Sequence, residues 1–165
     1  MIKIIAAIGK KLELGKAGHL IWHLPNDLKF FKEQTLGSCV LMGCNTFNSL
    51  PNKLPDRHHI VLAMETDTFN KDVNDVEIVN NFDAAIKKCE QISKNGETVF
   101  IIGGASVYSQ FLEFADELIL TEIDAECEDA DVFFPTFDKS KYVRKVISEN
   151  LDNDIHYKHV SYIKI

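Results

Sequence analysis

Short runs of almost uninterrupted apolar residues, followed by helix-like patterns, place the strongest constraint on the fold of this chain. Three such runs are residues 2–8, 39–43 and 98–102. A strand without polar alternation is covered on both faces, which is typical of a central parallel strand. Helical patterns follow the second and third runs, at residues 45–50 and 107–112. This alternation of strand and helix predicts an α/β protein.

The remaining segments extend this pattern and then depart from it. Strand-like runs at residues 59–63 and 76–79 precede a helical pattern at 82–92, which Asn81 caps. Three further strands then follow one another without helices, which indicates an antiparallel edge. We therefore expect a single domain, residues 1–165, built on a mixed, mostly parallel eight-stranded sheet with helices on both faces. The last three strands are residues 118–123, 142–148 and 155–163.

Residues 22–31 contain a helix start and one residue that does not fit the apolar face. Pro25 suits the first turn, because its fixed φ is helical and its missing N–H would have no partner there. The helix places Leu28 and Phe31 on an apolar face, and Asp27 stands beside them. Residues 9–24 show little apolar periodicity, so we expect a long mobile loop of the kind that covers functional sites.

Asp27 admits two interpretations. It can be an ordinary acid of the first helical turn, stabilised by the helix dipole and open to water. Alternatively, it is a carboxylate in an apolar cleft, where a ligand that offers two coplanar N–H groups would keep it charged. The amidine-like edges of pteridines and diaminopyrimidines are such groups. Taken alone, the residue favours the first interpretation.

Charge and composition narrow the class of partner. The formal charge of −7 argues against a nucleic acid or an anionic membrane, because both require a basic surface. The apolar run at residues 4–8 is too short for a signal peptide, and no run reaches the length of a membrane span. Neither the four cysteines nor His156 and His159 have the spacing of a metal site. We expect reduced thiols, no metal and a cytoplasmic protein.

Two strand-to-helix junctions and one arginine are candidate contacts for an anionic ligand. The junctions are residues 43–46 and 103–106, which would direct backbone N–H groups and a positive helix end at an anion. Two such ends in one cleft would suit a pyrophosphate. Neither is a GxGxxG motif or a P-loop, however, and a lone Gly-Gly pair more often reflects tight packing. Arg57 is likewise either a solvated turn residue or the partner of a ligand carboxylate.

Many short motifs along the chain form a specific set. They are Ile5-Ala6-Ala7, Gly15, Trp22-His23-Leu24-Pro25-Asn26-Asp27-Leu28, Phe31, Val40-Leu41-Met42-Gly43, Thr46-Phe47, Leu54-Pro55-Asp56-Arg57, Ile101-Ile102-Gly103-Gly104, Val107-Tyr108, Thr121 and Phe134-Pro135. In this order, and spread over almost the whole chain, they resemble the bacterial-type dihydrofolate reductase family. The resemblance implies reduction of 7,8-dihydrofolate to 5,6,7,8-tetrahydrofolate by hydride transfer from NADPH, which supplies one-carbon metabolism.

The resemblance also implies the roles of the substrate-site residues. Asp27, Trp22 and Thr121 would be catalytic: Asp27 would bind the 2-amino group and N3 of the pterin, with Thr121 nearby, and Trp22 would help to position an ordered water. Hydride would pass from C4 of the nicotinamide to C6 of the pterin. Water would protonate N5, while Asp27 orients and polarises the pterin. Arg57 would bind the glutamate α-carboxylate. The other substrate contacts would be Ile5, Ala6, Leu28, Phe31, Leu50, Leu54 and Ile102.

For the cofactor, the resemblance implies a longer series of contacts and a cis peptide between the paired glycines. The nucleotide would lie against the two junctions and the adjoining strand ends. We also expect a monomer that binds antifolate-type inhibitors. The cofactor contacts would be Ala7, Leu14, Gly15, Leu20, Gly43, Cys44, Asn45, Thr46, Leu62, Ala63, Met64, Ile102, Gly103, Gly104, Ala105, Ser106, Val107 and Tyr108.

The chain departs from the family where the 2′-phosphate of NADPH binds. The family commonly has arginines at the positions of Cys44 and Ser106 and a small hydroxyl residue near Met64, and this chain lacks all three. The nearby Glu65 and Asp67 would repel a phosphate and suit a free ribose hydroxyl. We therefore expect NADPH to be used with relaxed discrimination, together with useful NADH activity.

Two further departures concern the loop before the first helix. Ile21 replaces the usual proline, so the loop loses a stiffening residue. The acidic run 126–131 lies at the position of a family loop that steadies the lid and is one residue longer, with Asp131 as the matching residue.

Two competing functions stay open at this point. The related reductase domain of riboflavin synthesis shares the architecture, but it would need neither Asp27 on the apolar helix face nor Arg57. A non-catalytic relative that binds folate or a protein partner would explain the missing phosphate contacts, but not the intact residues on the pterin side.

Overall fold

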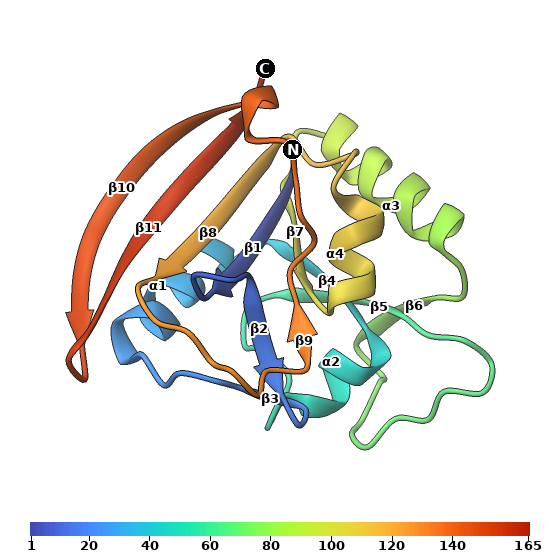
Figure 1. Ribbon diagram of the computed structural model, residues 1–165. Helices are drawn as coiled ribbons and strands as arrows, with labels where there is room; N and C mark the ends of the chain where they lie inside the picture. Colours follow the sequence, from blue (N-terminus) through green and yellow to red (C-terminus); the bar gives the residue numbers. More distant parts are fainter.

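One large sheet organises the computed structural model, which describes all 165 residues (Figure 1). In order across the sheet its strands are β10 (Tyr142–Asp152), β11 (Ile155–Lys164), β8 (Glu117–Ile123), β1 (Ile2–Ile8), β7 (Val99–Gly103), β4 (Cys39–Gly43), β5 (His58–Leu62) and β6 (Val76–Val79). Five neighbouring pairs are parallel, and the two pairs that contain β11 are antiparallel. The predicted α/β class, with a mostly parallel eight-stranded sheet and an antiparallel C-terminal edge, is confirmed.

Four helices cover the two faces of this sheet (Figure 1). Helices α1 (Pro25–Thr35) and α2 (Cys44–Ser49) pack on one face, and α3 (Phe82–Lys94) and α4 (Ala105–Phe111) pack on the other. Successive side chains of β1 point to opposite faces of the sheet, so this strand contributes to both hydrophobic cores. Ile4 belongs to the cluster under α3 and α4, whereas its neighbour Ile5 belongs to the cluster with Phe47 of α2. A 3₁₀ turn, η1 (Lys139–Lys141), leads into β10.

Residues 9–24 are not the structureless loop that the sequence predicts. Strand β2 (Glu13–Lys16) pairs with β3 (His19–Leu20) and with β9 (Val132–Phe133) in a separate three-stranded sheet. The prediction is wrong because these strands are short, and because the partner β9 lies far along the chain, where local periodicity carries no information about it.

The outer strand β10 is longer than the sequence predicts. The predicted end is at residue 148, because the polar residues that follow show no apolar alternation. In the structure the strand continues to Asp152, and Asn150 and Asp152 point inward and form hydrogen bonds. A β-bulge between Val146 and Ser148 shifts the register of this half of the strand.

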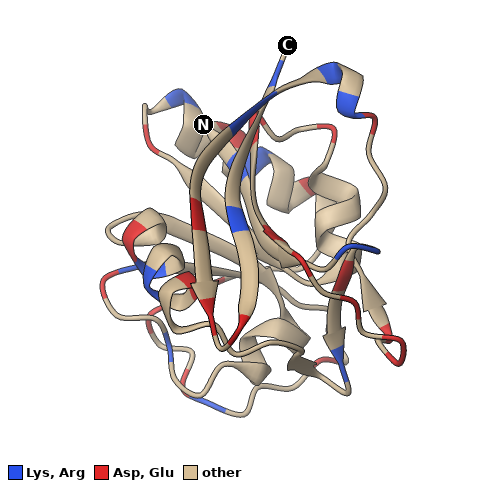
Figure 2. Cartoon of the chain, turned by 60° about the vertical axis from the view of Figure 1, so that its left-hand side comes forward, with Lys and Arg blue, Asp and Glu red and all other residues tan.

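Acidic and basic residues are interspersed along the chain (Figure 2). Strands β10 and β11 carry the bases Arg144, Lys145, Lys158 and Lys164 together with the acids Glu149 and Asp152, so both signs of charge occur along them. None of the helices combines the length and the apolar character that crossing a bilayer requires.

Glu13 of β2 ties the small sheet to the turn that precedes β9. Only 1% of the residue is exposed, and its carboxylate accepts hydrogen bonds from the backbone N–H groups of Lys11 and Cys127, both at 2.6 Å. Burial raises the pKa of Glu13, but these backbone donors outweigh it and hold the pKa below its ordinary value. Asp131 adds a second tie, because its carboxylate accepts the N–H of Ala17 at 3.0 Å.

Replacing Glu13 by glutamine (Glu13→Gln) should lower the free energy of unfolding by about 2 kcal/mol at neutral pH, because hydrogen bonds to a charged group are lost. The folded-state pKa lies below that of the unfolded chain. The stabilisation is therefore fully present above the unfolded value, about 4.3, and is lost as the pH falls through the folded value. Denaturant unfolding of both proteins across the acidic range measures this difference.

The matched control is Glu126→Gln, which alters an exposed acid beside Lys11 and should change stability by no more than about 0.5 kcal/mol. If the deficit of Glu13→Gln stays constant on acidification, the buried carboxylate is not its source.

Candidate active site

Asp27 lies in the first turn of α1, with its carboxylate directed at the sheet. Thr121 of β8 donates its hydroxyl to Oδ1 at 2.6 Å, and Nε2 of His159 in β11 lies 2.9 Å from the same oxygen. The side chain is 17% exposed. The geometry therefore does not fit the interpretation of Asp27 as a freely solvated acid and agrees with a carboxylate held within the protein.

The second carboxylate oxygen of Asp27 has no partner within the protein. Oδ2 accepts no hydrogen bond within the protein, and every buried side-chain oxygen has a partner, so Oδ2 is not among the buried atoms. Leu28, in the same helical turn, leaves 47% of its surface exposed. An apolar cluster of this face includes several of the predicted substrate contacts. These are the buried Ile5 and the partly exposed Phe31, Leu50, Leu54 and Ile102.

The start of α1 is held by Asp152, at the end of β10. The N-cap residue Leu24 provides no side-chain cap. Instead, the Asp152 carboxylate accepts the N–H of Asn26 at 2.9 Å, the side-chain amide of Asn26 at 2.6 Å and the Tyr157 hydroxyl at 2.8 Å. Burial raises the pKa of Asp152, but these three donors outweigh it, so the pKa is lowered and the group stays charged. One helix-terminal N–H is thereby satisfied from a distant strand.

Arg57 marks the other end of α1. Its Nε donates to the carbonyl of Pro55 at 2.8 Å, and its Nη1 donates to the hydroxyl of Thr35, the last helical residue, at 3.2 Å. The Thr35 hydroxyl donates in turn to the carbonyl of Phe31 at 2.8 Å. Since both acceptors of Arg57 are neutral, its charge is available to an anionic ligand.

A cleft of about 670 Å³ lies where β4, β5 and β7 end and α2 and α4 begin. All predicted cofactor residues line it except Ala63, which is buried, and Ala7, which packs against the cluster that contains Leu24. The peptide between Gly103 and Gly104 is cis, as the resemblance implies. The cleft also has lining residues that the sequence analysis did not single out. These are Gly18, His19, Ser49, Gln110 and Val132.

This cleft offers backbone N–H groups and hydroxyls, but no lysine or arginine. Neither Gly43 before α2 nor Gly104 before α4 supplies a side-chain cap, so the first N–H groups of both helices keep their hydrogen-bonding capacity. Cys44 is 5% exposed, and its Sγ faces the carbonyl of Thr68 at 3.5 Å. Asp67 is the acidic residue of the lining. The residues therefore suit a dinucleotide and provide no fixed positive charge for an additional phosphate.

Two of the predicted site residues, Trp22 and Ala6, form no hydrogen bond with the Asp27 carboxylate. Trp22 shares a small cluster with Leu24, and its ring lies so close to Gly9 that a Cβ there would be 2.6 Å away. Ala6 packs on the opposite face of β1, in the cluster that contains Ile4.

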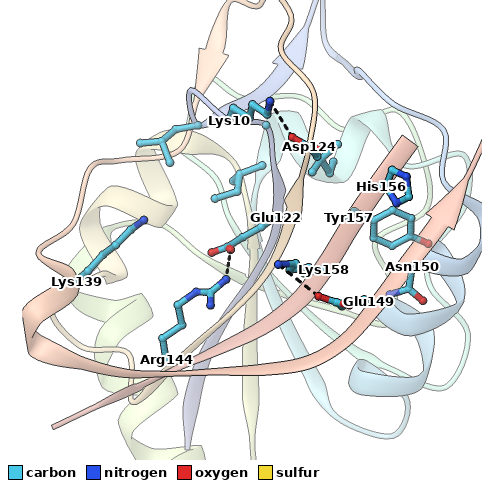
Figure 3. A pocket seen from close by; sticks show the side chains of 14 residues that line it. Lys10, Glu122, Asp124, Lys139, Arg144, Glu149, Asn150, His156, Tyr157 and Lys158 are labelled. Carbon is cyan, nitrogen blue, oxygen red and sulfur yellow. Dashed lines mark hydrogen bonds and ion pairs between the residues drawn. The ribbon is translucent and has the colours of Figure 1, made fainter. Parts of the chain in front are cut away.

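A second cleft, of about 560 Å³, lies on the outer side of β8, β10 and β11 (Figure 3). It is rich in charged side chains, and all of the lysines, arginines and acids except Lys139 pair with one another. A cleft that neutralises its own charges is poorly suited to a charged ligand, so we do not place the functional site there. Nor do three His, Cys, Asp or Glu side chains come together as a metal site would require. The ion pairs are Lys10 with Asp124, Arg144 with Glu122, and Lys158 with Glu149.

His159, Asp152 and Phe30, whose ring stacks on that of His159, are the site residues that the sequence analysis missed. His159 was considered only for its spacing from His156 as a metal ligand. The available signal was strand alternation, because Tyr157 and His159 share one face of β11 and both are buried. A buried histidine on the strand next to the predicted helix was therefore a candidate partner for Asp27, the one acid on the inner face of that helix.

The structure combines a mostly parallel α/β sheet, a cleft at the starts of α2 and α4, and a partly buried acid in the first turn of α1. Comparison with known proteins names the class: the family model described as dihydrofolate reductase matches residues 1–164, and the chain belongs to this family. The dihydrofolate reductase HdrB of Haloferax volcanii is 38% identical over 147 residues, which cover 85% of this chain and 73% of the relative. The dihydrofolate reductase of Bacillus subtilis is 37% identical, covering 86% and 80%. That of Staphylococcus haemolyticus is 34% identical, covering 96% and 93%.

Replacing Asp152 by alanine (Asp152→Ala) should loosen the first turn of α1, because the N–H of Asn26 loses its acceptor. We expect the backbone amide of Asn26 to exchange with solvent about tenfold faster or more. Hydrogen exchange followed by NMR measures this directly. Glu149→Ala removes an exposed carboxylate from the same strand and should leave the Asn26 amide unchanged. Equal exchange in the two variants would show that Asp152 does not anchor the helix.

Proposed function

We propose that this chain reduces 7,8-dihydrofolate to 5,6,7,8-tetrahydrofolate with a reduced nicotinamide nucleotide, and thereby supplies one-carbon metabolism. The observation that carries the proposal is the Asp27 carboxylate, whose Oδ1 is held by Thr121 and His159 while Oδ2 has no partner within the protein. Membership of the dihydrofolate reductase family supports the same activity. Neither of the two competing functions requires a carboxylate held in this way.

The spacing of charged groups along α1 supports a folate as the substrate. Asp27 lies in the first turn of α1, and Arg57 is hydrogen-bonded to Thr35, its last residue. The two charged groups are therefore separated by most of an eleven-residue helix. Such a helix is about 16 Å long. Dihydrofolate has a donor-bearing pterin at one end and a carboxylate at the other, with an apolar benzoyl group between them. The order of these three groups in dihydrofolate therefore matches the order of Asp27, the exposed apolar residues and Arg57 along the helix.

The residues of the larger cleft fit a nicotinamide dinucleotide. Gly43, Gly103 and Gly104 bring backbone to the ends of α2 and α4 without side chains in the way, and a Cβ on either of the paired glycines would meet Thr46 at 3.4 Å. These residues would hold the pyrophosphate through N–H groups. When bound, the reduced nicotinamide supplies the hydride.

Asp27 orients the pterin and does not carry the proton to N5. The carboxylate accepts the N–H groups of the pyrimidine edge, which fixes the ring in one plane and favours its protonated form. Water that enters beneath residues 15–24 delivers the proton to N5. Ile5, Phe31 and Leu54 exclude other water, which strengthens the interaction between the carboxylate and the ring.

Replacing Asp27 by asparagine (Asp27→Asn) should lower kcat/KM for dihydrofolate at neutral pH by about a hundredfold or more, because the shape is retained while the charge is lost. Steady-state oxidation of the nicotinamide measures this. Glu33→Gln, on the exposed face of the same helix, should behave as the parent protein does. Full activity in Asp27→Asn would reject the proposed function. The absence of dihydrofolate turnover in the parent protein would favour one of the two competing functions.

We further propose that discrimination between NADPH and NADH is relaxed. The larger cleft has no cationic side chain for a 2′-phosphate, Cys44 is turned toward Thr68, and Asp67 adds negative charge. A charge-assisted contact contributes roughly 1.5–3 kcal/mol, so the loss of two such contacts removes much of the preference for NADPH.

Introducing an arginine at residue 106 (Ser106→Arg) should raise the ratio of kcat/KM for NADPH to that for NADH by about tenfold or more, because it restores one charge-assisted contact. Ser106 is exposed and lines the cleft. Ser109→Arg, at an exposed position of the same helix outside the cleft lining, should leave the ratio unchanged. An equal response of the two variants would mean that the added charge acts at long range and that no phosphate site exists near residue 106.

The remaining expectations belong to the same proposal. We infer that the chain forms a single domain and acts as a monomer in the cytoplasm, where folates and reduced nicotinamides meet. Arg144, Lys145 and Glu149 interrupt the exposed edge strand β10, and charges of this kind keep an edge from pairing with another chain. Antifolates with a diaminopyrimidine ring would bind at Asp27, because they offer it the same paired N–H groups.

A further inference from the structure

Four residues form a row across four neighbouring strands. Ala7 of β1, Thr121 of β8, His159 of β11 and Ser148 of β10 are successive cross-strand partners. Partners of this kind project from the same face of a sheet. Thr121 and His159 both reach Asp27, so the row lies against the first turn of α1. The β-bulge that follows Val146 brings Ser148 opposite His159.

The imidazole of His159 is buried and held in one plane. Only 3% of the residue is exposed. Its ring stacks on Phe30 with 3.7 Å between centroids and 9° between planes, and Tyr157 packs edge-on at 5.5 Å. Phe30 lies three residues after Asp27, so the same side of α1 carries both the carboxylate and the ring that fixes the imidazole.

The surroundings of Nδ1 determine which ring nitrogen of His159 carries the proton. Nδ1 lies 2.9 Å from the hydroxyl of Ser148 and 3.3 Å from the side-chain amide nitrogen of Asn150. Asn150 lies beside Tyr157 at the end of β10 (Figure 3). Because an amide nitrogen only donates, Nδ1 is an acceptor and the ring proton resides on Nε2. Nε2 therefore donates to Oδ1 of Asp27 at 2.9 Å.

The hydrogen-bonding capacity of Oδ1 is consequently used within the protein. A carboxylate oxygen offers two lone pairs, and the Thr121 hydroxyl and the His159 ring occupy both of those on Oδ1. Two donors from adjacent strands also fix the rotation of the carboxylate about its last bond. Oδ2 then keeps both of its lone pairs and lies on the open side.

We propose that His159 is a positioning residue for the reaction: it locks the Asp27 carboxylate so that Oδ2 is the acceptor presented to the N–H edge of dihydrofolate. This inference rests on the proposed function. It assigns to the antiparallel edge of the sheet a part in substrate binding, because Ser148 and Asn150 of β10 set the tautomer that makes His159 a donor to Asp27.

Two substitutions separate the donor from the packing. His159→Phe keeps a planar ring against Phe30 and removes the N–H, whereas His159→Gln keeps an N–H near the position of Nε2 and removes the ring. His156→Phe is the control, because His156 is exposed and points to the other face of β11. The measurements are kcat and KM for dihydrofolate and for the nicotinamide cofactor. The dissociation constant of dihydrofolate is measured by the fluorescence of Trp22, the single tryptophan.

In His159→Phe we expect a fall of about tenfold in kcat/KM for dihydrofolate and a matching rise in its dissociation constant, with KM for the cofactor unchanged. His159→Gln should recover activity to within about threefold of the parent protein. In an Asp27→Asn background, His159→Phe should weaken dihydrofolate binding no further, because the carboxylate through which it acts is gone.

Three results would overturn the inference: parental behaviour of His159→Phe, equal losses in the phenylalanine and glutamine variants, or effects of His159 and Asp27 that simply add. A measurement on the parent protein guards against variants that fold poorly. NMR of protein labelled with ¹⁵N-histidine should find the proton of His159 on Nε2, and a proton on Nδ1 would equally reject the proposal. If the parent protein neither binds nor reduces dihydrofolate, it is the proposed function that fails.

Discussion

Withdrawing the Asp27 carboxylate from bulk water is the constraint on which the arrangement of this protein depends. An ionised carboxylate without hydrogen-bond donors is costly to remove from water, by several kcal/mol even after relaxation. The N-terminal end of α1 offsets part of this cost, and the two donors on Oδ1 offset more. These donors come from β8 and β11, so the helix, the parallel centre of the sheet and its antiparallel edge must all be in register.

The same solution is used for two other acids of the fold. Glu13 and Asp152 are buried, and both accept hydrogen bonds from groups far away in sequence. Each acid therefore joins two elements: Glu13 joins β2 to the turn before β9, and Asp152 joins β10 to α1. A hydrogen bond of this type is directional, so it specifies how two elements meet, which apolar packing alone does not. The antiparallel edge contributes little to the core through β10, yet it fixes both the start of α1 and, through His159, the acid within it.

Much of the fold could be predicted from the sequence, because its signals are local. Apolar runs marked the central strands, and Asn81 marked the start of α3, where its side chain accepts the N–H of Ala84 at 2.8 Å. Asp27 was visible as an acid on an apolar helix face. Its partner His159 was not visible, because the two are separated by 132 residues and only the register of β8, β11 and β10 brings them together. The small sheet of β2, β3 and β9 escaped prediction for the same reason.

Some candidate ligand contacts are backbone groups and others are side chains, and this difference explains where the chain can depart from its family. In the larger cleft, the contacts suited to a pyrophosphate are N–H groups at the starts of α2 and α4, and these depend on glycines and on strand geometry, not on side-chain chemistry. At the proposed cofactor site, binding of the common part of a nicotinamide nucleotide would therefore be insensitive to most substitutions. Recognition of a 2′-phosphate would fall on a few exposed side chains, which can change without disturbing the sheet. At Asp27, by contrast, the acid, its donors Thr121 and His159, and the Asp152 anchor of its helix belong to one hydrogen-bonded region, so a change in any of them would alter the others.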